Sequence, residues 1–268
     1  MMPLNEQKVI HLHVIAVCYY LSIKEFEQSV ERFISNLNYE NTYVTKNFLS
    51  IRENQKCNVS PWIPSLGDLL DMSAYSTGAM VVSDADCYLL LNDTLFSRNP
   101  WRMISRRFAD LIFALNAATK ASAVGLIHKS TDILMLDYQN PSRHHLSTFC
   151  FMLNRQAFQI FKEITQTLPC ASSIDTISIW VNENIKGNDA LNNLLYVHLS
   201  GSKTLWTWAG LKKNSSNDLV LKKQATVIIE YLLTSKILQS GGFIMPVNIG
   251  LIYKLRAKIC IIIARFYP

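Results

Sequence analysis

The stretch DADCYLLLNDTLFSRNPW, residues 84–101, is the part of the sequence from which the fold prediction starts. Residues 87–91 form a short apolar run, which is typical of a buried strand, and residues 92–94 (NDT) follow it directly. The segment then breaks at Asn99, and Pro100 is well placed as the first residue of a helix. A carboxylate at a strand end is either a plain turn residue or an acid that the sheet presents to a ligand.

Segments on both sides of this strand alternate between strand and helix patterns. Residues 9–20 are rich in Val, Ile and Tyr, as a buried parallel strand is, and they lead into an amphipathic helix that Ser22 can cap. The other predicted strands are residues 41–51, 121–130 and 145–154, and the other predicted helices are residues 66–80, 100–120, 155–165 and 224–239. Gly241 is placed to end the last of these helices. The alternation predicts an α/β fold with a mostly parallel sheet.

Composition narrows the classes of function. The 268-residue chain has a net charge of +6, but no basic patch with interleaved aromatic residues, which argues against nucleic-acid binding. The six cysteines form neither a CxxC pair nor a zinc-ligand cluster, which fits a reducing cytoplasm. No apolar run is long enough to cross a bilayer, and the first run is typical of a strand rather than a signal peptide. We therefore expect a cytoplasmic protein, either free or at the inner face of the cell membrane.

Common nucleotide-binding signatures are absent from the sequence. It contains no GxGxxG and no GxxxxGK[ST], so a nucleotide would have to be bound by a different structural feature. The GxSxG motif of hydrolases is also absent. No internal repeat or low-complexity linker divides the chain. We expect one domain over residues 1–249 and a basic amphipathic helix over residues 250–268, which either packs on the domain or lies on a membrane surface.

Three short segments carry a family resemblance: YLLLNDTLF (residues 88–96), HLSTFCFMLNRQAF (residues 145–158) and IIEYLLTSKILQSGGF (residues 228–243). In content and order they resemble the GT-A nucleotide-sugar glycosyltransferases of bacterial surface polysaccharide synthesis, most closely the rhamnan-synthesis type. The resemblance spans roughly residues 9–250. It implies a GT-A-like domain with a Rossmann-type mixed sheet. It also implies transfer of a sugar from a nucleotide-sugar donor to an acceptor hydroxyl of a capsule, O-antigen or rhamnan-type glycan.

The resemblance also assigns roles to residues at the strand end. It places Asp93 at the donor diphosphate and at a divalent cation, Mn²⁺ or Mg²⁺, while Asn92 and Thr94 orient the donor by hydrogen bonds. The family commonly has Asp-x-Asp here, whereas this chain has a single carboxylate. A second interpretation therefore stays open, a catalytically silent subunit of the same fold that serves in binding or assembly. A third, an unrelated nucleotide-binding α/β enzyme, would be favoured by a symmetrical doubly wound sheet.

Transfer to an acceptor hydroxyl needs a general base. The family-like helix supplies Glu230, and the less regular region before it supplies Asp175 and Glu183. For Glu230 the alternative is an ordinary glutamate on a helix surface. His144 and His145 precede a predicted strand, where they either contact a glycan or lipid-linked acceptor or are simply solvated.

Overall fold

The computed structural model describes residues 9–37, 42–51, 62–64, 69, 71–82, 84–98, 101–129, 144–168, 173–189, 191–192, 195 and 217–247. Its strands are β1 (Ile10–Cys18), β2 (Thr42–Ser50), β3 (Trp62–Pro64), β4 (Cys87–Asn92), β5 (Ser122–Lys129), β6 (His144–Asn154) and β7 (Phe243–Pro246). Its helices are α1 (Ile23–Ser35), α2 (Asp71–Val81), α3 (Thr94–Arg98), α4 (Trp101–Ala117), α5 (Arg155–Gln166), α6 (Ile174–Ile185) and α9 (Asn217–Gln239). The expected helix over residues 250–268 lies outside the described residues, so the domain boundary before it stays a prediction.

The strands form one mixed sheet in the order β3-β2-β1-β4-β6-β5-β7. The first four strands of this order run parallel, β6 runs antiparallel to both β4 and β5, and β7 runs parallel to β5. Val14 of β1 pairs with Lys46 of β2 on one side and with Leu89 of β4 on the other. The predicted α/β class, a mixed sheet flanked by helices, is confirmed. Because β6 is reversed, the sheet is not the symmetrical doubly wound sheet that would have favoured the third interpretation.

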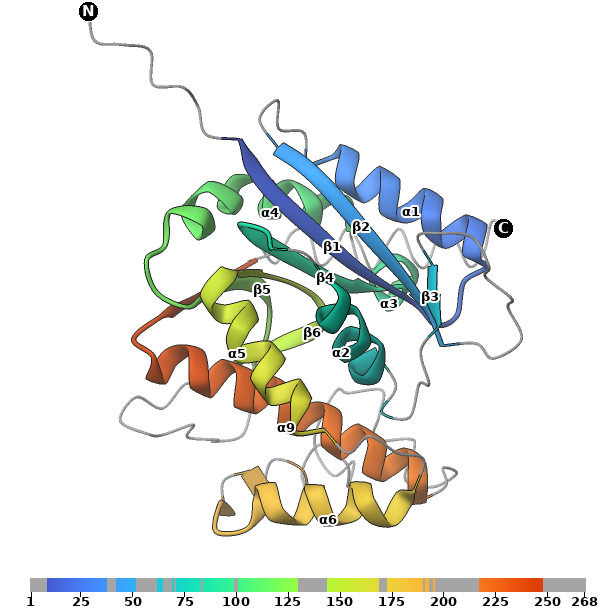
Figure 1. Ribbon diagram of the computed structural model, residues 1–268, viewed down its shortest axis with the longest axis vertical. Helices are drawn as coiled ribbons and strands as arrows, with labels where there is room; N and C mark the ends of the chain where they lie inside the picture. Colours follow the sequence, from blue (N-terminus) through green and yellow to red (C-terminus); the bar gives the residue numbers. More distant parts are fainter. Residues whose placement is uncertain are drawn as a thin grey trace, which may run out of the picture.

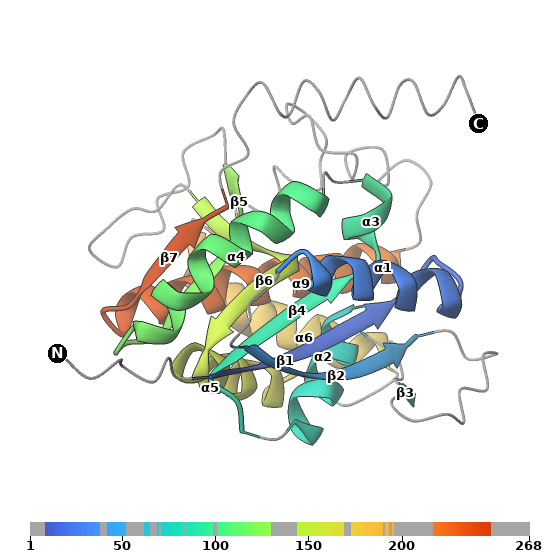
Figure 2. The same ribbon diagram turned by 90° about the horizontal axis from the view of Figure 1, so that it is seen from above.

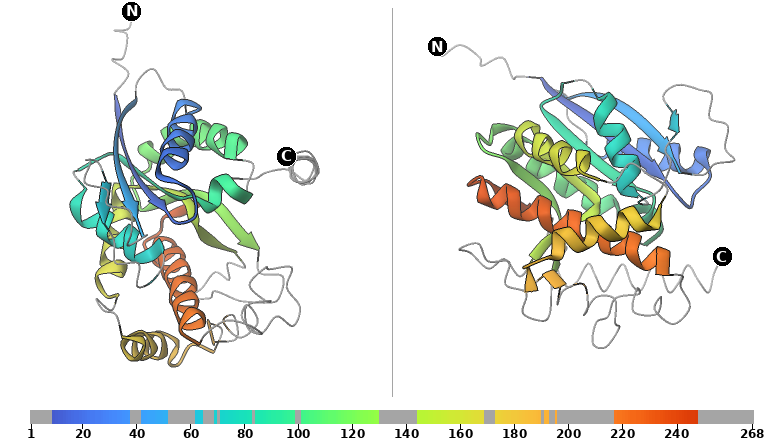
Figure 3. Two further views of the ribbon diagram at one scale, coloured as in Figure 1. Left: turned by 90° about the vertical axis from the view of Figure 1, so that its right-hand side faces the viewer. Right: turned by 60° about the horizontal axis from the view of Figure 1, so that its bottom comes forward.

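Helices cover both faces of the sheet (Figures 1 and 2). On one face, α1 and α4 enclose a core that includes Phe33 and Phe108. On the other, α2, α5 and α9 enclose a core that includes Tyr75 and Phe161. Helix α6 packs on α9 and lies beyond it, at the bottom of Figure 1. Figure 3 shows the same arrangement from two other sides. Helices α2 and α9, which carry residues of the candidate site described below, lie on the second of these faces.

Two helix ends follow the chemistry of their terminal residues. The Ser22 hydroxyl accepts a hydrogen bond from the Glu25 N–H, and the Glu25 carboxylate accepts one from the Ser22 N–H, which caps α1 as predicted. At the end of α9, Gly241 adopts a left-handed φ of +72°, and the Gly242 N–H donates to the Ile237 carbonyl at 3.1 Å. The predicted end of the last described helix is therefore confirmed.

Helix α2 lies unusually close to β1 because residue 78 is a glycine. A Cβ at Gly78 would meet Ile15 Cγ2 at 2.6 Å and Leu49 Cδ1 at 3.2 Å. Such a contact would force the helix and the strand apart. The close approach fixes α2 against the sheet, and its first turn reaches the carboxyl end of β4, where Asp71 contacts Asn92.

Several elements differ from the sequence prediction. Residues 94–98 form the short helix α3, which was not among the predicted helices, and α6 lies in the segment that we expected to be irregular. The four-residue strand β7 was not predicted, because a segment that short shows no clear period. The described part of the second predicted helix begins at Asp71 rather than at residue 66. None of the described helices has both the length and the apolar content that a bilayer span needs.

Candidate functional site at the carboxyl ends of β1 and β4

The candidate site lies where the strand order reverses. From β1 the chain proceeds outward to β2 and β3, and it then returns to place β4 on the other side of β1. In open α/β sheets, ligands bind at the carboxyl ends of the strands, at the point where the strand order reverses. Here the two connections are residues 19–22, which follow β1, and residues 93–94, which follow β4.

Asp93 joins these two connections. Its Oδ2 accepts hydrogen bonds from the backbone N–H groups of Tyr19 at 2.6 Å, Leu21 at 3.0 Å, and Tyr20 between them. Three successive N–H groups aimed at one point form an anion-binding concavity, which the Asp93 carboxylate fills. Asp93 is fully buried, and its Oδ1 has no hydrogen-bond partner within the described part of the chain. Asp93 therefore holds the turn after β1 against the end of β4.

Asn92 turns to the opposite face of the sheet and contacts α2. Its Nδ2 donates to Asp71 Oδ2 at 2.8 Å, and its Oδ1 accepts from the Thr94 N–H at 3.1 Å, so both ends of the amide are fixed. Asp71 is buried, and among the described residues its Oδ1 has no hydrogen-bond partner. Burial raises the pKa of Asp71, while the charge of Lys223 and the Asn92 hydrogen bond act in the opposite direction.

Tyr75 follows Asp71 by four residues on α2, so the two side chains lie on one face of the helix. Tyr75 is fully buried and packs edge-on against Phe151 with ring centroids 6.0 Å apart. Its hydroxyl lacks a hydrogen-bond partner in the residues that the structure describes. Burial raises the pKa of Tyr75 well above its ordinary value, and the charges of Asp71, Asp93 and Glu230 raise it further. The phenol thus lies within electrostatic reach of all three carboxylates.

Glu230 reaches the same neighbourhood from α9. Its Oε1 accepts hydrogen bonds from the Thr148 N–H at 2.8 Å and from the Thr148 hydroxyl at 2.7 Å. One turn further along α9, the Thr234 hydroxyl accepts from the Leu146 N–H at 3.0 Å, which fixes the helix on β6. Burial raises the pKa of Glu230 to about 7, against the lowering effect of the Thr148 hydrogen bonds. Glu230 is buried, so the alternative of an ordinary surface glutamate is not what the structure shows.

The other predicted site residues lie elsewhere. Asp175 and Glu183 are exposed on α6, on the far side of α9 from the sheet (Figure 3). His144 and His145 begin β6, where their backbones pair with Lys129 and His128 of β5. The fold thus brings Asp93 and Glu230 into one buried cluster and leaves the two α6 acids outside it.

Sequence reasoning missed three members of this cluster, Asp71, Tyr75 and Thr148. The signal that could have found the first two is their spacing of four residues in a helix of small and apolar residues, since a carboxylate on a buried face needs a reason. Thr148 carries no local signal, because its role depends on a helix that follows 82 residues later in the chain.

The cation that the resemblance implies has few ligands available at this place. Within the described residues, no group of three or more His, Cys, Asp or Glu side chains is arranged to hold a metal ion. Asp93 Oδ2 already accepts hydrogen bonds from backbone N–H groups, so only Oδ1 of this residue is left to bind a cation, whereas Mg²⁺ takes six ligands. The metal role of Asp93 stays a prediction, and no step of the function proposed below passes through a cation.

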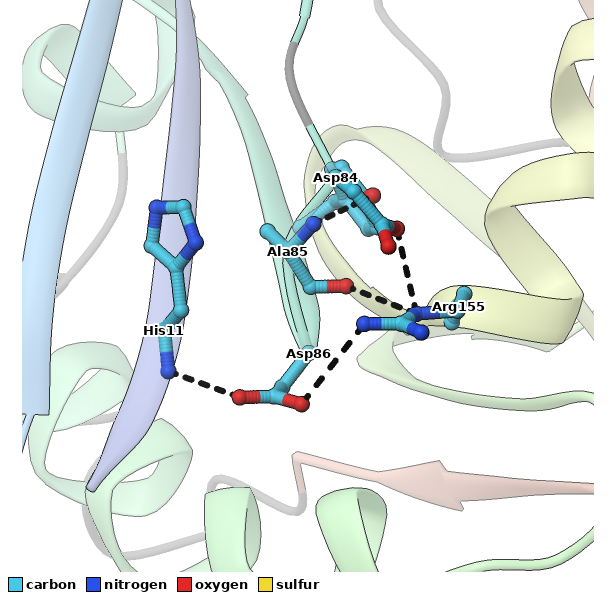
Figure 4. Close-up of polar contacts among 6 residues, drawn as sticks. His11, Asp84, Ala85, Asp86 and Arg155 are labelled. Atoms are coloured by element: carbon cyan, nitrogen blue, oxygen red, sulfur yellow. Dashed lines mark hydrogen bonds and ion pairs between the residues drawn. The ribbon is translucent and has the colours of Figure 1, made fainter.

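A separate pocket of about 420 Å³ opens at the opposite, amino end of β4. Its lining includes Asp84, Tyr88, Arg155 and Lys162. The Arg155 guanidinium there contacts Asp84 at 3.2 Å, the Ala85 carbonyl at 3.2 Å and Asp86 at 3.8 Å (Figure 4). Its charged groups largely satisfy one another, so size alone does not make this pocket the candidate site.

No family model and no curated protein matches the chain. Among solved structures it is similar to the crystal structure of 4-diphosphocytidyl-2C-methyl-D-erythritolsynthase from Anaerococcus prevotii DSM 20548, with a TM-score of 0.35 and 10% sequence identity. The similarity covers 64% of this chain and 84% of that chain. A likeness this weak carries no argument about function, so the family resemblance stays a prediction.

Proposed function

We propose that the chain is a glycosyltransferase that moves a sugar from a nucleotide-sugar donor to an acceptor hydroxyl of a bacterial surface glycan. The observation that carries the proposal is Glu230, a buried carboxylate with a pKa of about 7, which Thr148 holds beside the strand reversal. A general base acts best when its pKa lies near the working pH. Burial of an ionised carboxylate lowers the stability of the fold, so a buried carboxylate without a function would be unfavourable in the core.

The reaction assigns each group a place. Glu230 accepts the proton of the acceptor hydroxyl as the acceptor oxygen bonds to the anomeric carbon, and the bond from that carbon to the diphosphate breaks. The diphosphate leaves with the bonding electron pair. The donor lies in the crevice between the turn after β1 and residues 92–94. Asn92 and Thr94 are the proposed donor-binding residues beside this crevice, and Asp93 shapes it by holding the N–H groups of that turn.

Acceptor recognition is proposed for two further parts of the chain. His144 and His145 remain proposed acceptor residues from their place at the start of β6. The segment over residues 250–268 remains a proposed contact with the membrane of a lipid-linked acceptor. Deleting it is expected to lower binding to anionic vesicles, and unchanged vesicle binding would remove the membrane part of the proposal.

A catalytically silent subunit of the same fold is the second candidate. It is favoured by one observation: the only carboxylate of residues 92–94 is engaged with backbone N–H groups. This alternative predicts no transfer from any donor, even where a nucleotide binds.

Calorimetric titration with the diphosphates of uridine, thymidine, guanosine, cytidine and adenosine, with and without Mn²⁺, tests the proposal. We expect one nucleotide to bind, and the Asp93→Asn variant to bind it about tenfold more weakly because the turn after β1 loosens. Asp110→Asn on the exposed side of α4 is the control. Comparison of the two series shows whether Mn²⁺ contributes. Absence of binding by all five nucleotides would contradict the enzyme proposal.

A further inference from the structure

Three buried oxygen atoms at the candidate site lack a hydrogen-bond partner among the described residues: Asp71 Oδ1, Tyr75 Oη and Asp93 Oδ1. All three residues are more than nine-tenths buried. Buried polar atoms in folded proteins are nearly always paired, so unpaired ones need a specific explanation. Asp71 Oδ1 and Tyr75 Oη, which lie on one face of α2, indicate a place that is completed by a bound group.

The three residues belong to one cluster. Asp71 and Tyr75 share a face of α2. Asp71 also accepts a 2.8 Å hydrogen bond from the side chain of Asn92, the residue before Asp93. The pKa of Tyr75 responds to the charges of both Asp71 and Asp93. The contact at Gly78 fixes α2 on β1, so the two α2 side chains are held in place rather than free to turn away.

The cluster also reaches the surface. Tyr20 is 57% exposed, and its ring lies 4.9 Å from that of the half-buried Tyr19. The pKa of Tyr19 is raised to about 12 by burial and by the charges of Tyr20, Asp71 and Asp93. The backbone N–H groups of Tyr19 and Tyr20 both donate to Asp93 Oδ2, so the exposed Tyr20 adjoins the buried cluster.

The unpaired atoms define the chemistry of the missing group. Two are carboxylate oxygens, which when ionised accept hydrogen bonds and donate none, and the third is a phenol, which both donates and accepts. Asp71, Asp93 and Glu230 place three acids here, and among the described residues Lys223 is the cation whose charge acts on Asp71 and Glu230. A phosphate would be repelled by this charge. A neutral ring with adjacent hydroxyl groups would instead donate to the carboxylates and accept from the phenol.

We infer that the inner face of α2 carries a subsite for a hydroxyl-bearing sugar ring, with Asp71 and Tyr75 as its recognition residues. The inference rests on the proposed function and deepens it, because it separates sugar recognition from diphosphate binding. Asp71 also acts as a positioning residue, since it fixes the amide of Asn92. Two rings of a nucleotide sugar have the required chemistry, the ribose of the nucleotide and the transferred sugar.

Titrations of the full chain, of Asp71→Asn and of Tyr75→Phe test the subsite. The probes are uridine diphosphate, its 2′-deoxy form, uridine-diphosphate glucose and thymidine-diphosphate rhamnose. Methyl ribofuranoside, methyl glucoside and methyl rhamnoside, each without a nucleotide, are tested by saturation-transfer NMR. Asp71→Asn keeps an acceptor for Asn92, and Tyr75→Phe removes only a hydroxyl without a described partner, so both are expected to fold. Asp110→Asn is the control.

Each variant is expected to weaken binding of at least one sugar-bearing probe about tenfold, the range of one hydrogen bond to a charged group. Weakening of the nucleotide sugars alone assigns the subsite to the transferred sugar, whereas equal weakening of uridine diphosphate assigns it to ribose. If glycosides bind in an Asp71-dependent way but no nucleotide binds, the subsite stands and the proposed function fails. If no probe binds, or if neither variant differs from the control, the subsite is overturned.

Discussion

The two ends of β4 carry acids in contrasting surroundings. At the amino end, the Asp84 side chain is 72% exposed and paired with Arg155, and Asp86 accepts from the His11 N–H at 2.9 Å (Figure 4). At the carboxyl end, Asp93 is fully buried and, within the described residues, keeps one oxygen without a partner.

The two groups of acids differ in exposure and in pairing, and both properties bear on which group can take part in ligand binding. Solvated acids that pair with an arginine cost little and report little about function. Buried acids with unpaired atoms lower stability unless a ligand completes them. The 420 Å³ pocket lies at the first end, and within the described part of the chain the three unpaired acid and phenol oxygens lie at the second, whereas the unpaired His13 Nε2 and Thr42 Oγ1 lie nearer the first. The choice of the second end as the candidate site therefore rests on its buried acids and not on pocket size.

The largest expected effect is on catalysis. Glu230→Gln keeps an oxygen to accept from Thr148 but cannot take a proton, so we expect transfer to fall by about 10²- to 10⁴-fold. Initial rates of diphosphate release from the nucleotide sugar that binds are the measurement. Glu163→Gln on the exposed side of α5 is the matched control. Equal rates in the wild-type chain and Glu230→Gln would exclude Glu230 as the base.

A pair of matched substitutions sharpens the contrast between the two ends. Asp93→Asn removes the charge from three converging N–H groups, and we expect it to lower the free energy of unfolding by about 2–4 kcal/mol. The same change at the exposed Asp84 is expected to lie within about 0.5 kcal/mol of wild type. Urea denaturation measures both. Similar losses at the two positions would remove the distinction.

The pH dependence of stability isolates Glu230. Its pKa rises from 4.5 to about 7 on folding, so the folded chain binds the proton more tightly than the unfolded chain does. Its stabilising contribution is complete below pH 4.5 and is lost as the pH rises through 7. The free energy of unfolding of wild type relative to Glu230→Gln should fall over this window by up to ~3 kcal/mol. A pH-independent difference, from urea titrations at each pH, would show that burial does not shift this carboxyl.

The smallest expected effect is at the amino end. Arg155→Ala removes two ion pairs and a hydrogen bond from a half-exposed guanidinium, and we expect a loss of about 1 kcal/mol or less, with transfer unchanged. Thermal unfolding and the diphosphate-release assay measure the two quantities. A large loss of transfer in this variant would move the functional site to the 420 Å³ pocket.

Sequence patterns predicted those features that depend on neighbouring residues. The apolar run of β4 and the polar residues after it placed Asp93 at a strand end, Ser22 predicted the start of α1, and Gly241 the end of α9. The α/β class followed from the alternation of these elements. Each of these conclusions uses residues within a few turns of one another.

Features that depend on distant contacts were not accessible in the same way. The reversal of β6 leaves no trace in a buried apolar run, because parallel and antiparallel core strands look alike. The orientation of Asp93 is set by N–H groups 72 to 74 residues earlier. Asp71 was missed because its partner, Asn92, lies on another element.

Hydrogen–deuterium exchange with bound nucleotide sugar tests the central claim most directly, with uridine-diphosphate glucose, thymidine-diphosphate rhamnose and guanosine-diphosphate mannose as the probes. We expect amide exchange to slow in peptides that cover residues 19–22, 71–78 and 92–95, and to stay unchanged in peptides that cover residues 84–86 and 155–162. Protection confined to the second group, or protection nowhere with any of the three donors, would contradict a functional site at the carboxyl ends of β1 and β4.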